Sequence, residues 1–274
     1  MGISVSPLAG ADTAAPIEPR LQRAIDEVAT FDGVTISITD KNKSLRKFGE
    51  RTSLSTTSST LGEFAGEAHE TLLSTNGITS IVSSNAADTM TVRIEYHTIS
   101  GNDLTFGVQT ATLNGQTAVT LGTACARVSR LTVQGTTEAQ GAIYVYEGGA
   151  ITAGVPNDAT EVHLQLLAGQ QNSFKAATSI SSVDYFIVTE VTASLLSATN
   201  LECDIDLETK STTGVWQVAL EYAIATAGTT TFFIPLDPPL IIPSNTDIRL
   251  VGKMASGTAD VSGKFGGYLA SVVT

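Results

Sequence analysis

The sequence has few of the residues that carry enzymatic, redox and metal chemistry. Its 274 residues include two cysteines and three histidines. Cys125 and Cys203 lie far apart in the chain, whereas a metal or redox site needs a close pair or a cluster with histidine. We therefore expect both cysteines to be small buried apolar residues. His69, His97 and His163 are also isolated, and none belongs to an HExxH or other paired motif.

Recognisable catalytic motifs are missing as well. The chain contains no G-x-S-x-G nucleophile turn, no phosphate-binding P-loop and no G-x-G-x-x-G turn. We therefore predict that the protein is not an enzyme, that it has no cofactor and no metal, and that a small-molecule ligand is not its partner. No apolar run is long enough to cross a membrane and no signal peptide is recognisable, so we expect a soluble protein made in a cytoplasm.

Charged residues make up only 15% of the chain, and their signs are unevenly placed. Residues 1–60 hold seven basic and seven acidic residues, which leaves eight basic against twenty acidic residues in 61–274. The net charge is −12. Because an acidic surface repels nucleic acid, we expect the partners of this main part to be proteins and not DNA or RNA.

Hydrophobic residues make up 42% of the chain, and threonine is abundant, which suits half-buried strands. From Ile78 onward, short alternating or β-branched runs are separated by turn residues at regular spacing. This pattern predicts a mainly β fold with an antiparallel β-sandwich or jelly-roll body, either single or built of two stacked β domains. The predicted strands are ITSIVSS, TMTVRIEYHT, TAVTL, ARVSRLTV, AIYVYE, EVHLQLL, NSFKAAT, VDYFIVTEV, NLECDIDLET, GVWQVALEYAIA, TTTFFI, DIRLVGKM and ADVSGKFGGYLA.

The first sixty residues differ from this β-rich part. Apolar residues recur at helical spacing in IEPRLQRAIDEVAT, which predicts a helix over residues 17–30. The basic stretch at 41–51 and the Ser/Thr-rich run that follows it are typical of an extended arm. We expect three units with a soft boundary near Pro156: an N-terminal helix and arm at 1–60, a first β domain at 61–156 and a second β domain at 157–274.

Two local patterns predict finer detail. In TMTVRIEYHT, Val92 and Ile94 fall on one face of a strand while Arg93 and His97 fall on the other, which predicts a sheet with one wet side. The Asn-Gly pair of LNGQ predicts a tight hairpin between two strands. The short polar side chains of SSNAAD predict a turn that Asp88 could anchor.

A row of carboxylates stands out in NLECDIDLET. Glu202, Asp204, Asp206 and Glu208 alternate with apolar residues and so share one face of a strand. Carboxylate oxygens are the ligands that Ca²⁺ prefers. A single flat strand has no loop to wrap an ion, however, and this favours a solvated or subunit-facing surface over a metal site.

Several segments, taken in order, carry a family resemblance. They are KFG at 47–49, SSNAADT at 83–89, LNGQT at 113–117 and RVSR at 127–130, and with the sequence around them they cover residues 41–178. In this order they resemble a family of structural proteins of tailed-phage virions that recur beside the head and tail genes of marine phages. PLDPPLIIPSNTDIRLVG at 235–252 is similar to the return strands of jelly-roll virion domains. The resemblance implies a virion location and a head decoration, cement or minor virion protein, with the major capsid protein and copies of itself, as a homotrimer, for partners.

The basic stretch is then a candidate docking arm. We predict an interface with an acidic virion protein formed by Leu45, Arg46, Lys47, Phe48 and Arg51, with Leu45 and Phe48 as apolar anchors. A nucleic-acid arm is the other use of such a stretch, but five cations with one aromatic residue beside an acidic body favour a protein partner.

Two roles remain open. One is a capsid decoration subunit that stabilises the phage head, and the other is a tail, fibre or vertex component that binds a host surface through loops such as SGND, EGGA and AGVPND. These loops contain no Trp or Tyr, which glycan binding would favour, and this absence favours decoration. Four large aromatic residues are expected to lie mostly in the core, and any exposed one would mark a subunit interface. They are Trp216, Tyr222, Phe232 and Phe233.

Overall fold

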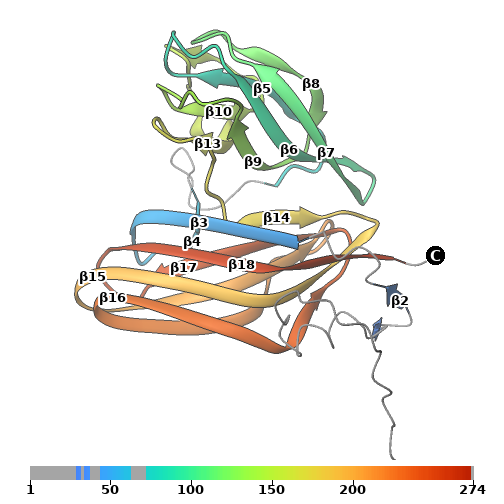
Figure 1. Cartoon of the computed structure of the whole chain (residues 1–274), viewed down its shortest axis with the longest axis vertical. Helices are drawn as coiled ribbons and strands as arrows, with labels where there is room; N and C mark the ends of the chain where they lie inside the picture. The colour runs from blue at the N-terminus through green and yellow to red at the C-terminus, as the bar shows by residue number, and fades with distance from the viewer. Residues whose placement is uncertain (1–28, 32–33, 38–43, 63–71, 273–274) are drawn as a thin grey trace, which may run out of the picture.

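The computed structural model of the chain describes residues 29–31, 34–37, 44–62 and 72–272. Within these residues the protein is almost entirely antiparallel β structure, as the sequence predicts. The predicted helix at 17–30 lies outside the described residues, except for its last two positions, which belong to strand β1. Figure 1 shows two stacked bodies, which we call the main body and the inserted body.

The main body contains a nine-stranded sheet that folds over on itself. Its strands come from both ends of the chain, so the main body closes only after the inserted body has been made. They are β1 (Ala29–Phe31), β2 (Val34–Ser37), β3 (Ser44–Leu54), β4 (Ser59–Thr60), β14 (Ala177–Ile180), β15 (Asp184–Ser211), β16 (Gln217–Ile242), β17 (Thr246–Met254) and β18 (Ala259–Val272).

The inserted body packs a three-stranded sheet, β7-β6-β9, against a four-stranded sheet, β13-β10-β5-β8. Its elements are β5 (Ile78–Ser83), β6 (Thr91–Ser100), β7 (Asp103–Thr112), β8 (Val119–Cys125), β9 (Arg127–Val133), β10 (Ile143–Tyr146), β11 (Ile151–Thr152), β12 (Val155–Pro156), the 3₁₀ turn η1 (Ala159–Glu161) and β13 (Val162–Leu166). The strand β13 follows Pro156 and yet pairs with β10. The domain boundary near Pro156 stays a prediction, but it does not coincide with the change of sheet.

Two very long strands build both layers of the main body. The first half of β15 pairs with β18, and its second half pairs with β17. The strand β16 runs beside β15 along both halves, and the register shifts between Ser197 and Leu201. The sequence analysis divided each of these strands into two, because the apolar alternation weakens where the pair passes from one layer to the other. That division was wrong for the backbone.

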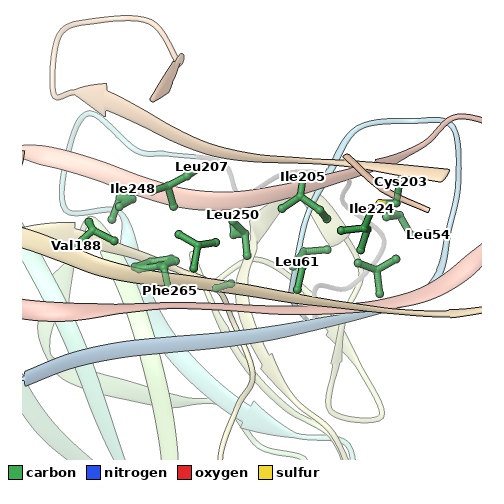
Figure 2. Close-up of a cluster of buried hydrophobic side chains, with 14 of the residues drawn as sticks. Leu54, Leu61, Val188, Cys203, Ile205, Leu207, Ile224, Ile248, Leu250 and Phe265 are labelled. Atoms are coloured by element: carbon green, nitrogen blue, oxygen red, sulfur yellow. The ribbon is translucent and has the colours of Figure 1, made fainter. Parts of the chain in front are cut away.

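The core of the main body lies between these layers, and Figure 2 shows part of it. Cys203, Ile205 and Leu207 project inward from β15, where they meet Leu250 of β17 and Phe265 of β18. All five are fully buried. Replacing a buried leucine such as Leu207 by alanine typically costs about 2–5 kcal/mol of stability.

The predicted turn at LNGQ forms, but the predicted hairpin was wrong. Asn114 bridges Thr117, and Gly115 adopts a φ of 56°. The strands on either side, β7 and β8, belong to different sheets, so the turn carries the chain from one sheet to the other. The Gly115 N–H donates to the Asp88 carbonyl at 2.8 Å, which ties this turn to the polar loop at SSNAAD.

Asp88 anchors that polar loop, as the sequence predicts. Its carboxylate is fully buried and accepts a hydrogen bond from Ser83 Oγ at 2.6 Å. It also accepts from the backbone N–H groups of Gln140 and Gly141. One side chain therefore joins segments more than fifty residues apart, which is a structural role.

Candidate functional site

The predicted interface residues lie on β3, which is hydrogen-bonded along β18 from Ser44 to Leu54. This part of the predicted arm is therefore a strand of the main body. Gly49 shows how closely the strand is held, since a Cβ at this position would overlap the Leu61 carbonyl and lie 2.5 Å from Ala176 N. Only glycine fits there.

The five predicted residues do not share one environment. Arg46 is exposed and Arg51 is partly exposed, while Leu45 packs against the core of the main body. Phe48 is 41% exposed and makes an edge-to-face contact with Phe174, with ring centroids 5.4 Å apart. Arg46, Phe48 and Arg51 are thus the members of the set that a partner could reach.

Lys47 has a different role, because it is only 6% exposed and its ammonium group points to the inserted body. It donates to the Ser129 carbonyl at 3.2 Å and lies 3.8 Å from a carboxylate oxygen of Glu95. Its charge is used inside the chain. Alternation along a strand predicted which side chains share a face, but not that another part of the chain would cover one of them.

The two bodies meet through buried charges. Arg127 of β9 forms a two-pronged ion pair with Asp247 of β17, with Nε to Oδ1 at 3.0 Å and Nη2 to Oδ2 at 3.1 Å. The hydroxyl of Ser179 also donates to Asp247. Lys175 donates to the Val128 carbonyl of β9. Planar pairing of guanidinium and carboxylate fixes orientation as well as distance, so this contact holds the bodies in one relative position.

A cavity of about 540 Å³ lies beside this contact. Side chains of both bodies line it, among them Arg46, Glu95, His97, Ser181 and Asp184. Burial, helped by the nearby Lys47 ammonium, lowers the pKa of His97 from 6.5 to about 3, so the imidazole stays neutral at physiological pH. His97 was predicted to lie on the wet face of β6, and this was wrong because the main body covers that end of the strand.

Neither cysteine has the properties of a nucleophile. Both thiols are buried and free, and burial raises the pKa of Cys125 to about 12 and that of Cys203 to about 11. A thiolate is the reactive form, so these values describe inert packing groups. No group of three or more His, Cys, Asp and Glu residues within the described part of the chain is placed to hold a metal ion.

The acidic row lies on the outer face of β15, opposite the buried Cys203, Ile205 and Leu207, as the alternation predicts. The chain itself neutralises one end of it. Arg249 of β17 donates to Glu208 at 2.7 Å and also lies over the Trp216 ring at 3.8 Å. Burial, followed by the neighbouring Glu221 carboxylate, raises the pKa of Asp206. The row is therefore partly an internal ion-pair surface.

The largest departure from the sequence analysis concerns the aromatic residues of β16. Phe232 and Phe233 are 47% and 56% exposed, whereas most of the four aromatic residues were expected in the core. Tyr222 packs at the edge of the core, with its ring stacked on that of Phe232. Leu196 on β15 is 55% exposed and adds to the same apolar surface. The expectation was wrong because β16 lies at the edge of the sheet.

Comparisons with known proteins find distant likenesses among solved structures. No family model and no curated protein matches the chain. An empty virus-like particle of Cowpea Mosaic Virus matches with a TM-score of 0.23 and 9% identity, over 78% of this chain and 90% of that one. The VP2 subviral particle of infectious bursal disease virus matches with a TM-score of 0.20 and 12% identity, over 92% of this chain and 78% of that one. The phage family suggested by the motifs stays a prediction.

The membrane question has a narrow answer. Within the part of the chain that the structure describes, no helix is both long and apolar enough to span a bilayer.

Proposed function

We propose that this protein is a non-enzymatic structural component of a tailed-phage virion, a capsid decoration or cement subunit that stabilises the head by protein contacts. The observation that carries the proposal is the apolar surface of Leu196, Phe232 and Phe233. Monomeric soluble proteins seldom expose several large apolar side chains together unless another protein covers them. The inert thiols and the neutral, buried His97 support a role without chemistry.

In this proposal β3 faces the major capsid protein. Arg46 and Arg51 supply cations and Phe48 supplies an apolar anchor, so an acidic patch with an apolar hollow is the complementary surface. Lys47 and Leu45 contribute indirectly, because they hold β3 on the inserted body and on the core. The subunit acts in the virion, with copies of itself in a homotrimer, and it needs no cofactor, nucleic acid or membrane.

The proposed β3 contact is tested by removing only its accessible side chains. A variant with Arg46→Ala, Phe48→Ala and Arg51→Ala should fold normally and fail to join particles in an assembly reaction. Lys253→Ala is a matched control, because Lys253 is an exposed cation on β17, away from β3. Incorporation of the triple variant at the level of the control would overturn the proposed contact.

The copy number of the chain tests the decoration role itself. Quantitative mass spectrometry of purified particles gives the ratio of this chain to the major capsid protein. A ratio approaching one copy for each capsid protein supports a role over the whole shell. Only a few copies in each particle would reject decoration in favour of the tail, fibre or vertex component that binds a host surface.

A further inference from the structure

The strand β16 has one unoccupied side over its whole length. It contains 26 residues and, among the described strands, pairs only with β15. Its other edge therefore presents a row of backbone N–H and C=O groups to solvent. Figure 1 shows β16 on the side of the main body that faces away from the inserted body, so no part of the inserted body covers it. Long exposed edges of this kind pair readily with another strand.

Proline and charge limit where a second strand can pair. Proline has no N–H group, and prolines occur at 235, 238 and 239, near the C-terminal end of β16. In the N-terminal half, Glu221 lies beside Asp206 on the acidic face of β15. The sequence TTFFI at 230–234 lies between these regions and contains neither charge nor proline.

We propose that TTFFI is a self-association site, where β16 of one copy pairs antiparallel with β16 of a second copy about a two-fold axis at Phe232. This register places Phe232 opposite its symmetry mate, Thr231 opposite Phe233, and Thr230 opposite Ile234. Every position then meets an uncharged residue. Aromatic and β-branched residues facing each other across strands are the pairs that stabilise a sheet most.

Charge explains why the occupant is a second copy. Each copy carries a net charge of −12, so two copies approach most easily where the local surface is neutral. Beside TTFFI the charges of Glu190 and Lys264 cancel, since their side chains are 3.2 Å apart. The N-terminal half of β16 would instead bring the two acidic rows towards each other. A foreign basic strand would favour that half, which separates the two occupants.

The contact closes at two copies, because a two-fold interface uses the same surface on both partners. It is therefore distinct from the three-fold contact proposed above, and it does not depend on a virion role. A dimer in solution would stand even if particles carried few copies of the chain.

Cysteine cross-linking tests the register. The two native cysteines are buried, so an introduced surface cysteine is the reactive one. In Phe232→Cys the facing Cα atoms would lie about 4.5–5.5 Å apart, within the range of a disulfide, and mild oxidation should give a covalent dimer. The control Val218→Cys, exposed on the same strand opposite Glu208, should stay monomeric. Equal cross-linking of both variants, or none of Phe232→Cys, would overturn the proposal.

Sedimentation equilibrium tests the affinity without a covalent bond. The unmodified protein should show a concentration-dependent dimer, and Phe232→Lys, which places two like charges at the axis, should weaken it by at least about tenfold. Because Phe232 is half exposed, the variant should still fold, and its thermal melt is the check. Val218→Lys is the matched control and should dimerise like the unmodified protein. A protein that stays monomeric across the concentration series would reject the contact.

Discussion

The ion pair between Arg127 and Asp247 gives the sharpest test of how the two bodies are joined. Both residues are nearly inaccessible, at 4% and 1% exposure, and two hydrogen bonds join the guanidinium to the carboxylate. Replacing Asp247 by leucine leaves the Arg127 cation buried without its counter-charge. Breaking a buried pair in this way typically costs about 3–5 kcal/mol, which corresponds to a fall of roughly 6–20 °C in the thermal midpoint of a chain of this size.

The assay combines scanning calorimetry with tryptophan fluorescence. Trp216 is the single tryptophan and lies in the main body, so its emission reports that body alone, while calorimetry reports both. The double variant Arg127→Met with Asp247→Leu should lose markedly less stability than the sum of the single variants, because no charge is left buried. Arg130→Met, at an exposed position of the same strand, should change stability by less than about 0.5 kcal/mol. A cost below about 1 kcal/mol for Asp247→Leu would refute the reasoning.

Three further predictions concern groups that burial perturbs. Because the pKa of folded His97 is about 3 against 6.5 when unfolded, the unfolded chain binds the extra proton and stability should fall as pH drops from 6.5 towards 3. In urea titrations His97→Phe should flatten this slope, and an unchanged slope would contradict the assignment. With their pKa values raised to about 12 and about 11, Cys125 and Cys203 should resist a thiol reagent in the folded protein and react once urea unfolds it; labelling of the native protein would argue against inert thiols. The pKa of Asp206 is raised, so its negative charge destabilises the fold at neutral pH and the effect fades on acidification. Asp206→Asn should therefore raise the thermal midpoint at neutral pH, with the exposed Asp237→Asn as a control, and a lower midpoint would count against this reasoning.

Local sequence patterns determined much of the secondary structure. Alternation in NLECDIDLET correctly separated the buried Cys203, Ile205 and Leu207 from the carboxylates on the opposite face. This works because the side-chain period of a strand is two and needs no knowledge of the partner strand. The strand β7 was missed, because DLTFGVQTAT buries little beyond Leu104 and Ala111 and so shows almost no apolar alternation.

The candidate site was predicted in part. The sequence correctly drew attention to β3 as a distinct basic segment, and the structure places Arg46 and Phe48 at its surface. The exposure of Phe232 and Phe233 could not be predicted from apolar character alone. An edge strand and a central strand can have the same composition, and only the order of strands in the sheet tells them apart.

Composition and periodicity by themselves determined that the chain is mainly β, that its cysteines are buried and which side chains share a strand face. Only the tertiary structure decided that Arg127 meets Asp247 across 120 residues, that β6 buries His97 and that β16 keeps a free edge. The physical reason is that periodicity records the conformation of neighbouring residues. Which surfaces meet depends on the packing of strands distant in sequence, and a local pattern carries no trace of that choice.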